Sequence, residues 1–148
     1  MLRATGIPDA TAGRFQLPVT ASDWTADYAA TTLAPACPQG PVPFLDDVLG
    51  TRYGELPGSE DCQRLSITVP EGLADGEHVP VMVWLHGGSY TSGSGDLAIF
   101  DAKSLVSENR VVVVSVTYRL GLFGYLSTGT ARPPNLGLLD QLEAFRCV

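Results

Sequence analysis

The sequence predicts an α/β fold with a parallel sheet, because two apolar strands flank a helical pattern. Residues 81–85 and 111–116 are continuous runs of mostly apolar residues, which is typical of strands buried on both faces. Between them, residues 97–108 carry apolar side chains at helical spacing, and Asp96 is in the position of an N-cap. A strand, a helix and a second strand in this order form a βαβ unit, which implies a right-handed crossover and parallel pairing.

The other predicted elements are short. Residues 65–69 form a strand, residues 71–77 form a polar turn that contains glycine, and a further helix occupies residues 138–145. Residues 1–60 show little periodicity, which predicts an irregular, loop-rich entry region. Seven prolines interrupt that region: Pro8, Pro18, Pro35, Pro38, Pro41, Pro43 and Pro57.

The composition is that of a globular chain that forms a core. It has 148 residues, enough for one ordinary domain, of which 45% are hydrophobic and 17% charged. Nine basic and 16 acidic residues give a net charge of −7, which provides no electrostatic footprint for nucleic acid or an anionic membrane. The longest apolar run, residues 111–116, is far too short for a transmembrane segment, and no signal peptide is visible.

The first apolar strand runs into a glycine-rich loop that carries the main functional signal. His86, Gly87 and Gly88 follow the strand directly, and glycines leave backbone N–H groups uncovered at the sheet edge. Such groups stabilise the oxyanion that forms during acyl transfer. A glycine-rich turn with no catalytic role is the alternative. Residues 93–95 could be mistaken for a phosphate loop, but no GK[ST] or GxxG pattern follows them, so no nucleotide, other cofactor or metal is predicted.

Further motifs occur in order along nearly the whole chain: Gly6-Ile7-Pro8, Gly13-Arg14-Phe15, residues 35–39, Glu60-Asp61-Cys62, residues 117–126 and residues 135–141. Together with the glycine-rich loop, they resemble the type-B carboxylesterase family, which includes the cholinesterases, some fungal lipases and the non-catalytic neuroligins. The resemblance implies a partial α/β-hydrolase fold, in which a mostly parallel central sheet is flanked by helices. Residues 1–148 would be the N-terminal part of one such domain, truncated before the nucleophile elbow.

The resemblance implies a serine carboxylic-ester hydrolase that acts on a small-molecule ester through an acyl-enzyme. By family position, the N–H groups of Gly88 and Ser89 would hold the oxyanion, Gly87 would supply the turn, and His86 would orient the loop. The catalytic serine, acid and histidine would lie beyond residue 148. The sequence has no G-x-S-x-G motif, and its only other histidine is His78. This chain alone is therefore expected to be inactive.

A non-catalytic function is the alternative, in which the esterase scaffold serves as an adhesion or binding module, as in the neuroligins. The serine that would decide between the two is not in the sequence, and the intact glycine loop favours the hydrolase. The sequence also departs from the family at two positions. Asp9 replaces the usual tyrosine after Gly-Ile-Pro, and Ser66 replaces the usual asparagine.

The cysteines bear on the compartment in which the protein matures. By family position, Cys37 and Cys62 would form a disulfide, which would stabilise the fold by about 3 kcal/mol in the loop-entropy treatment. Two free thiols are the alternative. A disulfide would place maturation in an oxidising compartment, so the protein is expected to be secreted or extracellular. Cys147 stands where the family usually has tryptophan and is interpreted as a free or buried thiol.

Two structural ion pairs are also implied by family position. Arg14 would pair with Glu60, and Arg119 with Asp140, and each pair would join distant segments of the sequence. The alternative is solvated surface charges that contribute little to stability. A pair is favoured for Arg119, because this residue lies between a buried strand and an apolar turn, where an unpaired charge would be costly.

Overall fold

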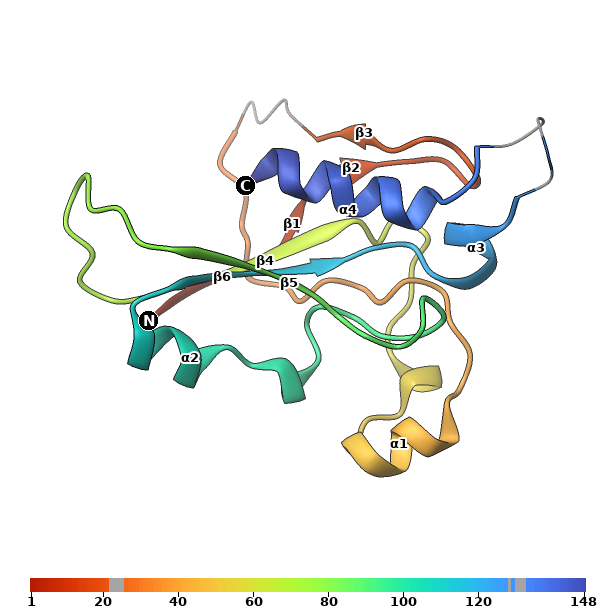
Figure 1. Cartoon of the computed structure of the whole chain (residues 1–148), viewed down its shortest axis with the longest axis horizontal. Helices are drawn as coiled ribbons and strands as arrows, with labels where there is room; N and C mark the ends of the chain where they lie inside the picture. The colour runs from red at the N-terminus through yellow and green to blue at the C-terminus, as the bar shows by residue number, and fades with distance from the viewer. Residues whose placement is uncertain (22–25, 128, 130–132) are drawn as a thin grey trace.

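Four strands form one mixed sheet in the order β1-β4-β6-β5. A computed structural model describes residues 1–21, 26–127, 129 and 133–148. The strands are β1 (Leu2–Pro8), β4 (Arg64–Val69), β5 (Val81–Leu85) and β6 (Val112–Thr117). β1 pairs antiparallel with β4 and β4 with β6, whereas β5 runs parallel to β6 (Figure 1). The parallel pair confirms the pairing predicted from the sequence.

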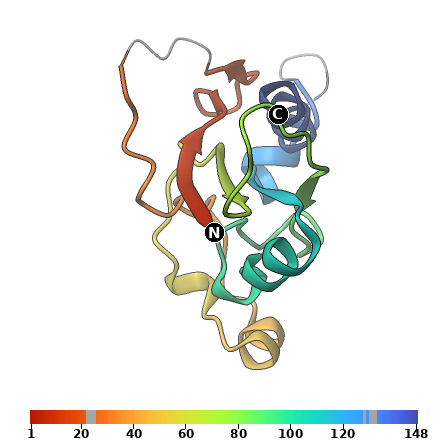
Figure 2. The same cartoon turned by 90° about the vertical axis from the view of Figure 1, so that its left-hand side faces the viewer.

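Helical elements lie on both faces of this sheet (Figures 1 and 2). The helical elements of the described chain are α1 (Pro43–Leu49), η1 (Tyr53–Glu55), η2 (Ala98–Phe100), α2 (Lys103–Asn109), α3 (Gly121–Tyr125) and α4 (Leu136–Cys147), of which α4 and α2 cover the two faces. α4, which contains the helix predicted at residues 138–145, covers one face with the hairpin of β2 (Ala10–Thr11) and β3 (Val19–Thr20). α2 lies on the opposite face. Among the helices described, none is long and apolar enough to cross a membrane.

β6 is the centre of the hydrophobic core because it lies between two other strands. Successive side chains of a strand point to opposite faces of the sheet. Val114 and Val116 belong to the same cluster as Ala144 of α4, whereas Val113 packs with Val106 of α2. β6 is therefore buried on both faces, as its apolar run predicts.

The prediction that residues 81–85 are buried on both faces is wrong. β5 lies at one end of the four-stranded sheet and has β6 on one side. Val81, Met82 and Trp84 are accordingly 51%, 42% and 39% exposed. A continuous apolar run identifies a strand, but it does not say whether strands lie on both sides of it.

The helix predicted over residues 97–108 is divided into η2 and α2. Asp101, between them, has extended backbone angles (φ −60°, ψ 114°), so the helix cannot continue through it. The Asp101 carboxylate accepts a hydrogen bond from the N–H of Lys103 at the start of α2 (3.1 Å). Asp96 is therefore not the N-cap of this helix. Its carboxylate instead accepts a hydrogen bond from the Ser66 hydroxyl at 2.8 Å.

The N-terminal region, predicted to be irregular, contains strand β1. The pairing of β1 with β4 shifts register between Ala4 and Ile7. Gly6 lies within this irregularity with φ +65°, and a Cβ there would be 2.4 Å from the carbonyl oxygen of Thr32. The register shift interrupts the two-residue alternation by which a strand is recognised in a sequence, which explains why β1 was not predicted.

Candidate active site

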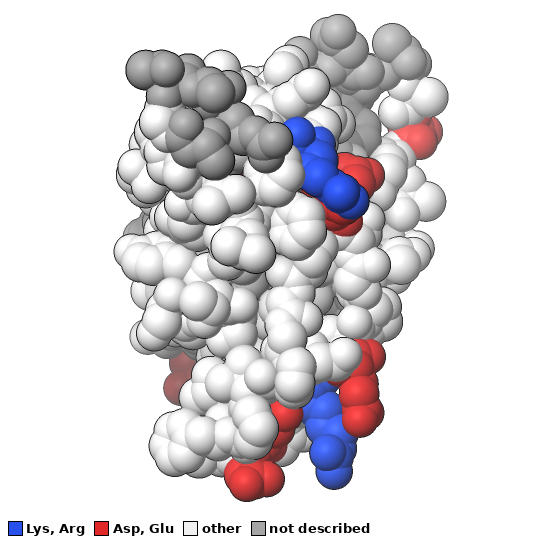
Figure 3. Space-filling view, turned by 90° about the vertical axis from the view of Figure 1, so that its right-hand side faces the viewer, with Lys and Arg blue, Asp and Glu red and all other residues white. Residues whose placement is uncertain are grey.

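A cleft lies at the edge of the sheet where the parallel strands β5 and β6 end. It has a volume of about 350 Å³ and is lined by Leu85, His86, Gly87, Ser89, Tyr90, Tyr118 and Gln141. The segments that follow two parallel neighbours leave the sheet at the same edge, so they build the cleft together. On the face of the molecule that contains this edge, charged side chains gather towards the two ends and leave the middle uncharged (Figure 3).

The glycine-rich loop folds back on the carbonyl oxygen of Gly88. This oxygen accepts hydrogen bonds from the N–H of Thr91 (3.0 Å) and the N–H of Ser92 (3.2 Å). Gly88 has φ +115°, and a Cβ there would lie 2.0 Å from the carbonyl oxygen of Ser92, so the turn requires glycine. Ser89 and Tyr90 continue in the left-handed region, with φ 53° and 61°. Residues other than glycine rarely adopt this backbone conformation, so the backbone at these two residues is strained.

The N–H groups of Gly88 and Ser89 have no hydrogen-bond acceptor among the residues that the structure describes. Ser89 and Gly87 both line the cleft. Backbone N–H groups are strong donors that normally find a partner, and neighbouring donors without one can bind an anion. The loop therefore offers two adjacent donors beside a cleft.

His86 is buried behind this loop as a neutral group. Its ring stacks on Tyr118 with the centroids 4.4 Å apart, and its Nδ1 lies 2.8 Å from the carbonyl oxygen of Gly87. A carbonyl only accepts, so Nδ1 carries the proton, and the buried Nε2 has no partner within the described part of the chain. Burial lowers the pKa of His86, and the contact with the Gly87 carbonyl opposes this to a smaller extent. The other histidine, His78, is exposed in the turn after β4.

Tyr90, Tyr118 and Gln141 line the cleft and were not predicted as site residues. The Tyr118 hydroxyl donates to the carbonyl oxygen of His86 (2.8 Å), and the Tyr90 ring packs on Tyr125 with the centroids 5.0 Å apart. Burial raises the pKa of Tyr125, so its hydroxyl stays protonated. Tyr118 continues the two-residue period of β6, which could have placed it on the same face as the buried valines. Tyr90 and Gln141 carry no comparable signal in the sequence.

Arg119 and Asp140 form a buried, two-point ion pair between the segment after β6 and helix α4. The Arg119 Nε and Nη2 donate to the two Asp140 oxygens at 2.8 and 2.6 Å. The Arg119 backbone N–H donates to the same carboxylate (3.0 Å), and Nη1 donates to the carbonyl oxygen of Gln16 (2.8 Å). The two side chains are only 4% and 1% exposed. The structure thus brings together the two residues that the family position paired.

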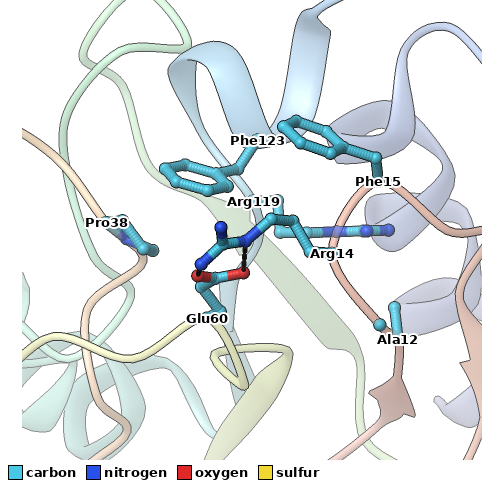
Figure 4. Close-up of a pocket in the computed structure, with 8 residues that line it drawn as sticks. Ala12, Arg14, Phe15, Pro38, Glu60, Arg119 and Phe123 are labelled. Atoms are coloured by element: carbon cyan, nitrogen blue, oxygen red, sulfur yellow. Dashed lines mark hydrogen bonds and ion pairs between the residues drawn. The ribbon is translucent and has the colours of Figure 1, made fainter.

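Arg14 and Glu60 form a second ion pair, which is exposed (Figure 4). Arg14 Nε donates to one Glu60 oxygen at 2.8 Å, and Nη2 contacts the other oxygen. The guanidinium also lies against the ring of Phe123, which stacks on Phe15 with the centroids 5.8 Å apart. The hydrogen bonds from Arg14 lower the pKa of Glu60. The pair ties the loop after β2 to the segment before β4, and its exposure makes its contribution to stability small.

Cys37 and Cys62 are joined by a disulfide and belong to the main core. The bond closes the loop that contains α1 and η1. Cys147 is a free thiol, and its Sγ donates to the carbonyl oxygen of Asp9 at 3.4 Å. In the described ranges, no group of three or more histidine, cysteine or acidic side chains could hold a metal ion.

The sequence model of a family described as the carboxylesterase family matches residues 5–148. Neuroligin-2 of Mus musculus is 38% identical over 95% of this chain and 21% of its own length. Para-nitrobenzyl esterase of Bacillus subtilis is 38% identical over 91% of this chain and 27% of its own length. A thermophilic PNB esterase of known structure superimposes with a TM-score of 0.82 at 37% identity, over 97% of this chain and 30% of that one. The chain thus spans about a quarter of the length of these relatives.

Proposed function

The chain belongs to the carboxylesterase family and has part of its α/β-hydrolase fold, and on that premise we propose that it supplies the oxyanion-binding loop of a serine carboxylic-ester hydrolase. The observation that carries the proposal is the pair of N–H groups of Gly88 and Ser89, which lack an acceptor in the described chain at the edge of the cleft. In acyl transfer, negative charge develops on the carbonyl oxygen of the ester. Donors aimed at that oxygen stabilise the transition state, and the loss of one typically costs about 3–4 kcal/mol.

His86 and Gly87 support these donors. Gly87 lines the cleft, and its carbonyl oxygen accepts a hydrogen bond from His86 Nδ1. Because the imidazole is neutral and buried, it holds the loop without adding a charge beside the oxyanion. The residues that line the cleft include no aspartate, glutamate, lysine or arginine, which suits a neutral, small-molecule carboxylic ester.

The nucleophilic serine and its acid and histidine partners would come from sequence outside residues 1–148. The chain has no G-x-S-x-G motif, and in this fold the triad follows the order serine, acid, histidine. We therefore assign residues 1–148 to the N-terminal part of a single hydrolase domain. The complete protein would act through an acyl-enzyme, which needs no cofactor. The Cys37–Cys62 disulfide supports a location in an oxidising compartment, either secreted or at the cell exterior.

A second candidate function, a non-catalytic adhesion or binding module, is favoured by the similarity to neuroligin-2. On this hypothesis the scaffold, held by its disulfide, would bind a partner, and the N–H groups of the loop would have no catalytic role. The two candidates differ in whether this loop can support ester hydrolysis when a triad is provided, which the following experiment measures.

A chimera supplies the missing triad. Residues 1–148 replace the matching segment of the Bacillus subtilis para-nitrobenzyl esterase, and we expect the product to hydrolyse a p-nitrophenyl ester. Gly88→Ala should lower kcat by about 100-fold or more, because the new methyl group meets the Ser92 carbonyl at 2.0 Å and displaces the donors. The measurement is kcat and KM by absorbance, with circular dichroism to verify folding.

Gly72→Ala is the matched control. Gly72 also has a positive φ (+67°), but nothing lies within 4 Å of its Cβ position, so the substitution strains the backbone without blocking the loop. A folded chimera without activity would favour the second candidate function. The 148-residue chain alone should show no turnover above the uncatalysed rate. Turnover that a serine-directed inhibitor abolishes would show that a nucleophile exists within residues 1–148.

A further inference from the structure

We infer that Gln39 is a positioning residue, which fixes the oxyanion-binding loop to the disulfide-closed loop between Cys37 and Cys62. The role given to the loop rests on the function proposed above. Within the described part of the chain, the Gln39 side chain hydrogen-bonds to Cys37 and Gly93 and not to Gly88 or Ser89, so it would act on the loop donors through Gly93.

The Gln39 side chain pairs with the backbone of Gly93 in both directions. Nε2 donates to the Gly93 carbonyl oxygen at 2.8 Å, and the Gly93 N–H donates to Oε1 at 2.7 Å. These two bonds have the pattern of a pair of residues in an antiparallel ladder, although 54 positions separate the residues in sequence. The second hydrogen of Nε2 reaches the carbonyl oxygen of Cys37 at 3.2 Å. The amide thus uses both of its hydrogens and its oxygen.

Gln39 extends from a backbone segment that is held in place at Cys37. Cys37 is 1% exposed, belongs to the main core and is covalently bonded to Cys62. Cys62 lies two residues before Arg64, the first residue of β4, so the disulfide attaches this segment to the sheet. Because the backbone that carries Gln39 is already fixed, its side chain loses less conformational entropy when it hydrogen-bonds to Gly93, and it therefore holds Gly93 more firmly.

Gly93 transmits this position to the oxyanion-binding loop through direct contact. A Cβ on Gly93 would lie 2.1 Å from His86 Nδ1 and 2.8 Å from the Gly87 carbonyl oxygen, so the Gly93 backbone is packed against both groups. Those two groups are hydrogen-bonded to each other and directly precede Gly88. On the other side, the Ser92 N–H donates to the Gly88 carbonyl oxygen. A shift of Gly93 would therefore move the loop at both of its ends.

The first test measures amide hydrogen exchange in the 148-residue chain. Gln39→Met keeps the length of the side chain and removes its hydrogen bonds. We expect the amides of Thr91 and Ser92, which close the turn on Gly88, to exchange about tenfold faster, since losing two hydrogen bonds loosens the loop. The amide of Val114 in β6 serves as the reference for the global fold.

Two further variants make the exchange test specific. Asp47→Ala changes an exposed residue of α1 in the same disulfide-closed loop, and it should leave Thr91 and Ser92 unchanged. Gln39→Glu has the size of glutamine but presents a carboxylate to two carbonyl oxygens, so it should loosen the turn at least as much as Gln39→Met. Equal exchange in the wild type and both Gln39 variants would overturn the inference, as would equal acceleration by Asp47→Ala.

The second test measures catalysis in the chimeric esterase. Gln39→Met should lower kcat about tenfold and change KM less than twofold, because the loop donors act mainly on the transition state. A rise in KM with kcat unchanged would refute the role in positioning the donors. If the chimera with the wild-type segment is inactive, the proposed function fails, and the exchange of Thr91 and Ser92 still decides whether Gln39 holds the loop.

Discussion

Asp9→Asn is expected to stabilise the chain by an amount that grows as the pH rises from about 4 to about 7. Asp9 is 1% exposed, and neither of its carboxylate oxygens has a hydrogen-bond partner in the described structure. Burial raises the pKa of Asp9 from 3.8 to about 7; the nearby Asp140 adds to this effect, while adjacent backbone N–H groups, which lie outside hydrogen-bond geometry, and the charge of Arg64 oppose it. Asp9 stands where the resemblance to the family implies tyrosine, so the carboxyl is a local departure from that pattern.

The direction of the pH dependence follows from the number of protons that the folded and unfolded chains bind. Between about pH 4 and pH 7, the folded chain keeps the Asp9 proton and the unfolded chain releases it, so the stability of the wild type falls as the pH rises through this range. Asparagine has the same shape and never ionises. The two chains should therefore have similar stability near pH 4, and above pH 7 the variant should be more stable by about 4 kcal/mol.

Urea titrations of both chains at several pH values measure this difference. Burial lowers the pKa of His86, which makes the folded chain less stable in acid, but that contribution is common to both chains and cancels. Asp75→Asn, at an exposed position in the turn after β4, is the control and should give a flat difference. A stability difference between Asp9→Asn and the wild type that does not vary with pH would show that the Asp9 carboxyl is not held protonated by burial.

Asp140→Leu is expected to lower the free energy of unfolding by about 3–5 kcal/mol, because it leaves the Arg119 guanidinium buried without its counter-ion. Three donors of Arg119 lose their acceptor: the backbone N–H, Nε and Nη2. Among the residues that the structure describes, only Nη1 keeps a partner, the carbonyl oxygen of Gln16. A hydrophobic replacement of one partner therefore removes the Coulomb attraction and leaves the desolvation cost of the other.

A double-mutant cycle separates the pair from its surroundings. Adding Arg119→Met to Asp140→Leu removes the orphaned charge, so the double variant should recover much of the lost stability. Glu60→Gln, in the exposed pair with Arg14, is the matched control and should have a much smaller effect. If the two single variants add without coupling in urea titration, the ion pair does not hold α4 to the sheet in the way the geometry indicates.

The elements that were predicted correctly are those whose signal is local. β6 has strands on both sides, so its apolar run describes its surroundings accurately. β5 has the same kind of run, but its exposure depends on which strands lie beside it, and this information is not local. The break at Asp101 and the irregularity at Gly6 both depend on single backbone conformations, which hydrophobic periodicity does not report.

The residues of the candidate site likewise fall into those with a local signal in the sequence and those without one. Gly87 and Gly88 were proposed because two glycines directly follow a predicted strand, and glycines leave their backbone N–H groups uncovered. The Arg119–Asp140 pair and the Cys37–Cys62 disulfide came from family position, since nothing in their spacing specifies the partners. Gln39 lay inside a recognised motif, yet its contact with Gly93 joins loops 54 residues apart and becomes visible only in three dimensions.

The close approach of Gly93 to His86 also has an evolutionary consequence. A methyl group at position 93 would overlap the imidazole and would also lie 2.8 Å from the Gly87 carbonyl oxygen, and Gly93 has φ +124°. Position 93 therefore accepts only glycine while the loop keeps its shape, whatever residue stands at position 86. Among sequences that share this loop, glycine should be retained at position 93, and a larger residue there would mark a loop of different shape.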